Sequence, residues 1–549
     1  MIKPNIPLLP PEGYVPLPGS EHRPSLEVKI LGPADNKESI VATIVLRRRI
    51  DGPSFPDFEY FTKCYPKNHK RLSVDEFASN YGAHPDDINK IIDFAEKNGL
   101  QILESHPARR TVVISGTVEQ MNKSFAITLK CYEHKVVKHR GGRPEKESYR
   151  GRQGFMHVPA GLAKIIVGVF GLDNRRITKR NSVEPPSTTK ITIDQIRRFY
   201  NFPTNSATGQ TIAVFSEAGY TEADIKSNFP DKLPEIIEVN VNAKNDGKAD
   251  PETTQDIYVV ASAAPGAKIA VYFTTNDQGG WVNLINRVVH PDEGDPICNV
   301  LSNSFYVADS DDMGLLPPFS QNWIDTVSMA FQDAAVQKIT VCCASGDNGT
   351  DSKVGDKHAH VQYPGSDPWV LCVGGTTIRN IIGDSFDEYV WNDIMPNGHG
   401  CATGGGVSGY FPKPSYQNKA HVPRSLNNGH IGRGVPDVAA NASPNSGIPM
   451  IIAGKSDAAI GTSASSPLWA GLIAVINAAL GEPVGFINPH IYKMGSKVFR
   501  DITGKEGPKD NALADAPGYP AYKGWDACTG WGSPNGVELL KAFQNLNRE

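Results

Sequence analysis

The chain has 549 residues, of which 39% are hydrophobic, and a formal net charge of −4. This length exceeds one average domain, and the hydrophobic content is enough to fill more than one core. The weak charge gives no support for a nucleic-acid partner, and no apolar run approaches the roughly 20 residues that span a bilayer.

Residues 1–174 are predicted to form an N-terminal arm and a small α+β domain of ferredoxin-like type. The arm is rich in proline, a composition typical of disorder. Runs of β-branched residues indicate strands, and capping boxes or an apolar face indicate helices. The expected strands are 40–46 and 111–115, and the expected helices follow Ser73, cover 88–95 and follow Thr117.

Residues 175–190 have the composition of a linker, with a basic run followed by Pro185 and Pro186. A basic run at such a place is usually a solvated loop. Exposed loops between domains are also where proteolysis concentrates. We therefore expect a processing site within this linker.

Residues 191–549 alternate apolar strands with helical stretches, which predicts an α/β domain with a doubly wound parallel sheet. The expected strands are 211–215, 268–273, 299–302, 340–344 and 369–373. The glycine-rich segment 403–408 is either a plain turn or a place where a substrate backbone approaches closely.

A helix over about 250–264 carries two acidic residues one turn apart. Asp250 suits the N-cap and Pro251 the first helical position. Glu252 and Asp256 are i and i+4, so they share a face. If the two carboxylates are close, one pKa rises and the pair can pass a proton under acidic conditions. The alternative is a solvated acidic face at the helix start.

The predicted strand 340–344 leads into a tight turn that contains Asp347. The carboxyl ends of parallel strands are where open α/β sheets place their sites. Asp347 is either a turn residue or a protonated carboxyl group that donates a hydrogen bond to a tetrahedral oxyanion.

The run from Gly461 through Thr462, Ser463 and Pro467 into an apolar helix is the most informative feature of the chain. Ser463 is expected in the first turn, where unpaired N–H groups and the helix dipole favour a developing anion. Pro467 is expected in the same turn, where its missing N–H costs nothing. The alternative is an ordinary Ser/Thr-rich N-cap.

The pattern Gly-Thr-Ser-x-x-x-Pro resembles the nucleophile segment of subtilisin-like serine peptidases, but no histidine here stands in their His-Gly-Thr-His context. Together with the acidic pair and the aspartate turn, nearly the whole chain resembles the sedolisins, or serine-carboxyl peptidases, in their kumamolisin-like branch. The resemblance implies an acid-active endopeptidase with a subtilisin-like core, made as a self-processing zymogen and inhibited by its pro-domain. It implies Ser463 as nucleophile, Glu252 and Asp256 as proton-transfer pair, and Asp347 in the oxyanion hole.

Two further properties follow from the resemblance. Kumamolisin-like enzymes often extend the proton relay with another glutamate and a tryptophan. Those positions fall here on Ser216, with Glu217 one residue on, and on Phe305, so the chain departs from the pattern. The family also binds one calcium ion through two aspartates and main-chain carbonyls, an all-oxygen set that calcium accepts. The corresponding residues are Asp501, Ile502, Tyr522, Gly524 and Asp526.

The remaining expectations concern partners, location and alternatives. We expect a monomer that acts on protein or peptide substrates, binds neither nucleic acid nor membranes, and works outside the cell by family resemblance, although the N-terminal residues lack the apolar core of a secretory signal. The eight cysteines include no Cys-x-x-Cys, so zinc is not expected. Two other interpretations stay open: a peptidase with His399 or His430 as base, and an inactive scaffold on this fold.

Overall fold

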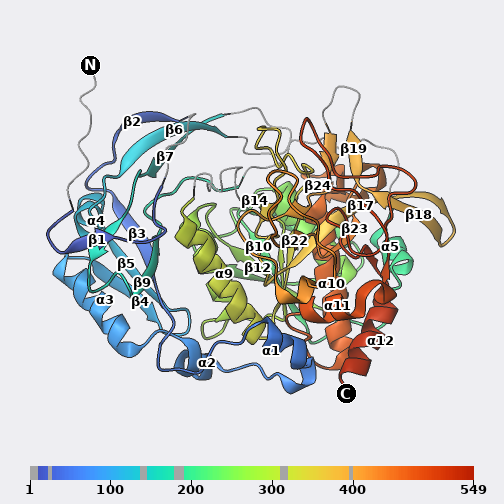
Figure 1. Ribbon diagram of the computed structural model, residues 1–549, viewed down its shortest axis with the longest axis horizontal. Helices are drawn as coiled ribbons and strands as arrows, with labels where there is room; N and C mark the ends of the chain where they lie inside the picture. The colour runs from blue at the N-terminus through green and yellow to red at the C-terminus, as the bar shows by residue number, and fades with distance from the viewer. Residues whose placement is uncertain are drawn as a thin grey trace.

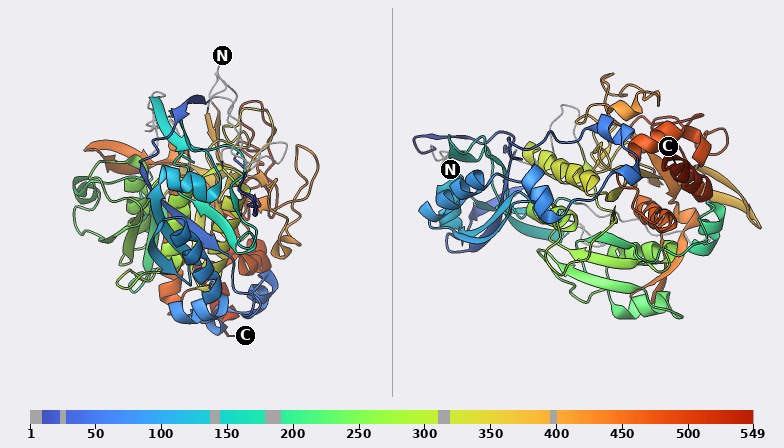
Figure 2. Two further views of the ribbon diagram at one scale, coloured as in Figure 1. Left: turned by 90° about the vertical axis from the view of Figure 1, so that its left-hand side faces the viewer. Right: turned by 90° about the horizontal axis from the view of Figure 1, so that it is seen from below.

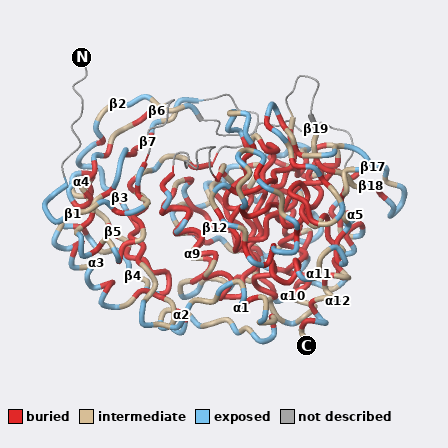
Figure 3. The backbone as a smooth tube through the Cα atoms, viewed as in Figure 1, coloured by how far each residue is buried: buried red, intermediate tan, exposed pale blue. Residues whose placement is uncertain are grey.

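The computed structural model describes residues 10–22, 28–136, 145–178, 191–309, 319–394 and 400–548. Two lobes lie side by side in Figure 1, the smaller in blue and cyan and the larger in green to red. Buried residues are concentrated in the larger lobe (Figure 3). The first nine residues of the predicted arm and linker residues 179–190 lie outside the described part of the chain.

The N-terminal domain is built on a four-stranded antiparallel sheet, against which α3 (Pro85–Lys97) and α4 (Val118–Phe125) pack. Its strands lie in the order β4 (Gln101–His106), β5 (Thr111–Thr117), β3 (Ser39–Leu46) and β9 (Ile166–Phe170). In chain order these elements run β3-α3-β4-β5-α4-β9, which is the ferredoxin-like arrangement. The predicted class is confirmed. Both capping boxes are present, and a second sheet is formed by β2 (Lys29–Pro33), β6 (Lys130–Val136) and β7 (Glu145–Gly151).

An eight-stranded sheet lies at the centre of the larger domain. Along its main path the strands are β11 (Glu235–Asn240), β12 (Lys268–Phe273), β10 (Thr211–Ser216), β13 (Val300–Asn303), β15 (Thr340–Ala344), β17 (Leu371–Ile382) and β18 (Ser385–Val390), and β23 (Val438–Asn441) pairs with β17. All neighbours are parallel except β17 and β18. The predicted parallel sheet is confirmed, and β12 and β15 have the predicted bounds.

The predicted strand 369–373 begins in the wrong place. The observed strand starts at Leu371, because the Asp367 carboxylate accepts the Trp369 N–H at 2.9 Å and holds the preceding residues in a turn. An Asp side chain that binds a backbone N–H two residues on is a turn former, and here it outweighs the apolar character of the segment.

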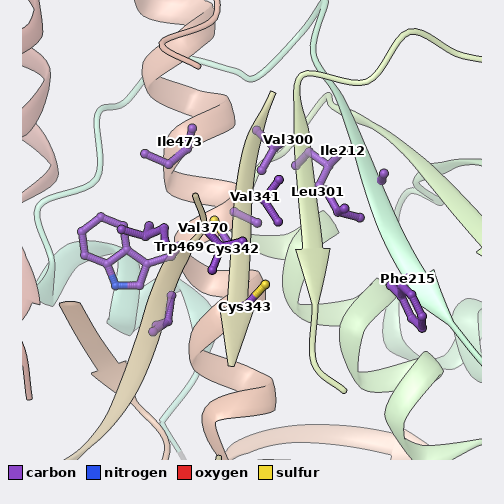
Figure 4. Packing of buried hydrophobic residues seen from close by; sticks show 14 of the residues in the cluster. Ile212, Phe215, Val300, Leu301, Val341, Cys342, Cys343, Val370, Trp469 and Ile473 are labelled. Atoms are coloured by element: carbon purple, nitrogen blue, oxygen red, sulfur yellow. The ribbon is translucent and has the colours of Figure 1, made fainter. Parts of the chain in front are cut away.

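Helices cover the sheet of the larger domain, as the two further views in Figure 2 show. Helices α7 (Pro251–Ala263) and α10 (Thr462–Leu480) contact each other, and α8 (Gln278–Val289) and α9 (Gln321–Val336) contact each other and strands of the N-terminal domain. Figure 4 shows Trp469 and Ile473 of α10 among apolar residues of the sheet. All eight cysteines are free thiols, and Cys342, Cys343 and Cys372 lie buried in β15 and β17.

Helix α10 is long and apolar enough to cross a membrane by length and composition alone, a property that the sequence analysis overlooked. However, 83% of its most apolar window is buried inside the protein. A helix that is apolar on all sides is also what the core of a large domain requires. We therefore interpret α10 as the central core helix of the larger domain.

Between β3 and α3 the chain leaves the N-terminal sheet and crosses the larger domain. Its helix α1 (Phe58–Lys63) places Phe58 against Trp369, with ring centroids 4.2 Å apart, and Phe61 against Phe486, with centroids 5.5 Å apart. These aromatic contacts fix the segment between β3 and α3 to the larger domain. The helix is visible in blue beneath the larger lobe in Figure 1.

A buried ion-pair network joins the two domains. Asp333 on α9 has a fully buried side chain and accepts hydrogen bonds from Arg48 at 2.8 Å and from Arg110 at 2.6 Å. Burial alone would raise the pKa of Asp333, but the charges of Arg110 and Arg48 lower it well below its usual range. The carboxylate therefore stays ionised and paired far into the acidic range.

We expect the Asp333→Asn variant to lose about 3 to 5 kcal/mol of unfolding free energy, because two guanidinium groups then remain buried without a counter-charge. Urea unfolding measures the loss. Since the pKa is depressed in the folded state, this stabilisation is present above the ordinary carboxyl pKa and is lost only as pH falls through the lowered value. The exposed Glu119 provides the control, Glu119→Gln, and equal midpoints for both variants would contradict the prediction.

Candidate active site

Ser463 is the second residue of α10, two positions after the N-cap. The N-cap is Gly461, with φ of +81° and no capping side chain. A Cβ at Gly461 would lie 2.6 Å from Asp347 Oδ2, so only glycine allows this approach. Ser463 therefore lies among the helix-start N–H groups, as predicted, and its side chain is largely buried.

The prediction for Pro467 was wrong. Pro467 is the sixth residue of α10 and lies inside the helix, where proline cannot bond the carbonyl four residues earlier. That carbonyl belongs to Ser463, and it accepts the Ser304 hydroxyl at 3.3 Å instead. The proline thus leaves an acceptor on Ser463 through which the helix start binds a neighbouring strand end.

The acidic pair lies on the first two turns of α7. Asp250 caps the helix by accepting the N–H groups of Glu252 and Thr253, both at 3.1 Å. Asp256 is fully buried, so a solvated acidic face is the wrong description of this residue. Burial first, and then the charge of Glu252, raises the pKa of Asp256 well above its ordinary value, while a hydrogen bond from Ser304 acts in the opposite direction.

Ser304 connects the acidic pair to the serine. It directly follows β13, and its hydroxyl lies 2.7 Å from Asp256 Oδ1. The Ser463 hydroxyl lies 3.5 Å from the Ser304 carbonyl oxygen. Asp256 and Ser463 therefore both contact Ser304, Asp256 at its hydroxyl and Ser463 at its carbonyl oxygen. The sequence analysis did not identify Ser304, although its position just after an expected strand was a usable signal.

Asp347 is bound to the start of the nucleophile helix. Its Oδ1 accepts the backbone N–H of Thr462 at 2.8 Å and the Thr462 hydroxyl at 2.7 Å. The same hydroxyl accepts the N–H of Gly346 at 3.0 Å. A carboxyl group held in this way has one oxygen committed to the helix start, so it is more than a turn former.

Tyr306 is a residue of the site that the sequence analysis missed. Burial first, and then the charges of Asp347 and Glu252, raises the pKa of its phenol well above the ordinary value. The phenol therefore stays protonated. Its position two residues after Ser304 was the available signal.

The side chains at the positions of the extended proton relay, Ser216, Glu217 and Phe305, contact different parts of the larger domain. The Ser216 hydroxyl lies 2.7 Å from the Thr253 hydroxyl on α7. The Glu217 carboxylate instead accepts the indole N–H of Trp281 at 2.9 Å. The ring of Phe305 packs near Phe215, with centroids 5.6 Å apart. Adjacent residues of a strand face opposite sides, which explains the divergence of the first two.

His399 and His430 are the two histidines considered as alternative bases. His399 lies outside the described residues. His430 has one ring nitrogen 2.8 Å from the Ser408 carbonyl and the other 2.6 Å from Asn428 Oδ1. Among the residues that the structure describes, no histidine is hydrogen-bonded to Ser463.

The glycine-rich segment 403–408 packs against the active-site turn. A Cβ on Gly404 would lie 1.9 Å from the Ser345 carbonyl oxygen, and the Gly404 N–H bonds the Gly346 carbonyl at 2.7 Å. Close backbone packing within the protein therefore accounts for this glycine.

The predicted calcium residues share one C-terminal loop region. Asp501 Oδ2 accepts the Gly524 N–H at 2.8 Å, and Asp526 Oδ2 accepts the Tyr522 N–H at 3.1 Å. Burial raises the pKa of Asp526 to about 7. Asp501 Oδ1 is buried and has no hydrogen-bond partner among the described residues. A buried carboxylate oxygen without a hydrogen-bond partner fits a hard cation.

The fold and the site together define a class of protein: a serine-type peptidase that carries an activation domain ahead of its catalytic domain. Two family models match the chain, "Pro-kumamolisin, activation domain" over residues 27–175 and "Subtilase family" over residues 240–493. Kumamolisin from Bacillus sp. (strain MN-32) is 37% identical over 96% of each chain, and tripeptidyl-peptidase sed5 from Aspergillus fumigatus is 30% identical over 97% of each.

Among solved structures, Pseudomonas sedolisin complexed with two molecules of pseudo-iodotyrostatin matches with a TM-score of 0.54 at 23% identity, covering 66% of this chain and 99% of that one. This likeness shows the fold alone. From its identity to kumamolisin along almost its whole length, the chain belongs to the sedolisin family of serine-carboxyl peptidases, in the kumamolisin-like branch, and is made as a zymogen.

Proposed function

We propose that the chain is an acid-active endopeptidase whose chemistry is carried by Ser463, Glu252, Asp256 and Asp347. Ser463 attacks the scissile carbonyl while Glu252 accepts its proton. Asp256 orients Glu252 and shares the proton, and Asp347 with nearby N–H groups holds the oxyanion. Glu252 then protonates the leaving amine, and water hydrolyses the acyl-enzyme by the reverse route. The observation that carries the proposal is that Ser304 contacts both groups: its hydroxyl donates to Asp256 Oδ1 at 2.7 Å, and its carbonyl oxygen lies 3.5 Å from the Ser463 hydroxyl.

Carboxyl groups suit this work in acid. A general base is most effective near its own pKa, and a carboxyl group reaches that point well below neutrality. A histidine would already be protonated there and would accept no proton. The raised pKa of Asp256 supports the proposal, because the pair then holds one proton over a wide acidic range.

A second candidate is the release of tripeptides from amino termini, because the Aspergillus relative is described as a tripeptidyl-peptidase. Mass spectrometry of the products from a denatured protein distinguishes the two. Internal cuts support the endopeptidase, whereas products confined to successive tripeptides favour the second candidate.

We also propose that the zymogen processes itself within residues 175–190, and that the mature enzyme works as an extracellular monomer, since an acid peptidase kept latent suits an acidic exterior. Incubating the purified full chain at a series of acidic pH values is expected to give one cut in this linker, together with hydrolysis whose optimum lies below neutrality. Electrophoresis and mass spectrometry locate the cut, and a substrate assay measures how hydrolysis depends on pH. An uncut chain in an active preparation contradicts the processing, and a near-neutral optimum favours a histidine base.

We further propose that one Ca²⁺ ion is held by Asp501 and Asp526 with main-chain carbonyls of Ile502, Tyr522 and Gly524. The support is the buried Asp501 Oδ1, which has no hydrogen-bond partner among the described residues, and the buried Asp526 carboxylate of the same loop region. A bound cation would neutralise both carboxylates and fix the loop on the domain.

Chelation is therefore expected to lower the melting temperature by a few degrees, equivalent to about 3 kcal/mol at a saturating ion concentration. Differential scanning fluorimetry with a chelator, followed by added Ca²⁺, measures the loss and its reversal. The Asp501→Asn variant should lose this dependence. The control is Asp515→Asn, which changes an exposed carboxylate near the same loop. Identical melting with and without chelator in the wild type would count against the site.

A further inference from the structure

Ile177 and Thr178, in the first part of the linker, are bound by the larger domain through specific polar contacts. Asn276 Oδ1 accepts the backbone N–H of Ile177 at 2.9 Å and that of Thr178 at 3.0 Å, and Asn276 Nδ2 lies 2.6 Å from the Thr178 hydroxyl. Glu217 Oε2 accepts the same hydroxyl at 2.9 Å. Ile177 and Thr178 are 7% and 6% exposed. Asn276 and Glu217 thus bind two peptide N–H groups and one side-chain hydroxyl.

These two residues lie on the edge of the sheet that carries the active site. Asn276 follows β12 and Glu217 follows β10, and the next strand, β13, leads to Ser304. Strands in a sheet are about 5 Å apart, and an extended peptide advances about 3.3 Å per residue. A peptide held at Glu217 and Asn276 is therefore within a few residues of the bond that Ser463 would attack.

The larger domain positions the pair by itself. Glu217 Oε1 accepts the indole N–H of Trp281, whose side chain is fully buried on α8. The adjacent Asp277 caps the same helix by accepting the Gly280 N–H at 2.9 Å. Because neither contact involves the pro-segment, the geometry of the pair persists when the pro-segment leaves.

We infer that Asn276 and Glu217 form a specificity-determining subsite for peptide substrates, one that recognises a large apolar residue followed by Ser or Thr. In the zymogen this subsite is filled by Ile177 and Thr178. The inference rests on the proposed endopeptidase function and adds the substrate class. A Val in place of Thr has the same shape but offers no hydroxyl, which leaves the Glu217 carboxylate and the Asn276 amide without their partner.

The test uses full chain activated in acid and internally quenched peptides that differ only in one pair, Ile-Thr, Ile-Ser or Ile-Val, moved stepwise along the peptide. At one position we expect kcat/KM to be about tenfold higher for Thr and Ser than for Val. The Glu217→Leu variant should lose this preference, and Glu217→Gln should keep it, because an amide oxygen still accepts a hydroxyl. The matched control, Glu222→Leu, changes an exposed carboxylate on the neighbouring helix α6 (Glu222–Asn228) and should behave as wild type.

A second arm examines the zymogen, independently of added substrate. Thr178→Val should shorten the lag before acid activation, whereas Thr178→Ser should leave it unchanged. Suppose that Thr178→Val shortens the lag but the wild type cleaves Val and Thr peptides at equal rates at every position. The contact then only holds the linker in the zymogen, and the proposed subsite is overturned. Retention of the preference in Glu217→Leu also overturns it. If the wild type cleaves proteins but shows no such preference, the proposed function survives; if it cleaves nothing, both fail.

Discussion

Replacing Ser463 with alanine is expected to lower kcat by about four to six orders of magnitude, because the hydroxyl that would form the acyl-enzyme is removed. Folding should be preserved, since the side chain makes one long contact, to the Ser304 carbonyl at 3.5 Å. A continuous assay on a denatured protein, with far-UV circular dichroism on the same sample, measures both. The variant should also fail to cut its own linker.

The matched control for this experiment lies one turn along the same helix. Ser466 is fully buried, and its hydroxyl has no hydrogen-bond partner among the described residues. Ser466→Ala therefore removes the same atom from the same helix and should keep nearly full activity. Residual hydrolysis within tenfold of wild type in Ser463→Ala would show that the nucleophile is elsewhere.

The acidic pair should give the second large effect, with a pH signature. Burial first, and the charge of Glu252 second, raise the pKa of Asp256, so the pair is expected to hold one proton in acid, with Glu252 as the proposed base. Glu252→Gln should then lower kcat by about three orders of magnitude, since the base is lost. Asp256→Asn should lose only about tenfold, because a neutral amide resembles the protonated acid. Its activity should extend to higher pH than that of the wild type.

The pH–rate profiles of the three proteins provide the measurement, and thermal melting across the same pH range provides a second one. A carboxyl group whose folded-state pKa lies above its unfolded value favours the fold fully below the unfolded pKa, and this contribution is lost as pH rises through the folded value. The wild type should therefore lose stability relative to Asp256→Asn on going from acid to neutral pH. An active Glu252→Gln enzyme with an unchanged profile would overturn the assignment of the base.

Local chemistry explains which parts of the fold were predictable. Strands β12 and β15 were predicted to the residue because their β-branched runs end at clear turns. The capping boxes at Ser73 and Thr117 depend on residues three apart, and both are present. Pro467 was misplaced because its position depends on where the helix begins, and Gly461, not a Ser or Thr, is the N-cap.

The site was predictable only in part, for a different reason. The pairing of Glu252 and Asp256 could be predicted because helical spacing brings them together. Ser304, in contrast, lies 48 residues from Asp256 and 159 residues from Ser463 along the chain. Its role depends on β13 lying beside α10, which is a property of the tertiary structure. The pairing of Arg48 with Asp333, 285 residues apart, is of the same kind.

The segment between β3 and α3, which carries helix α1, has a consequence for how the enzyme becomes active. Phe58 and Phe61 dock on the catalytic domain through Trp369 and Phe486, and the Arg48 and Arg110 pairs with Asp333 add a second point of attachment. Neither depends on the covalent link at residues 175–190. A molecule cut once there remains a two-piece complex, so its activity should emerge with first-order dissociation of the fragment and rebinding should slow that emergence in concentrated samples.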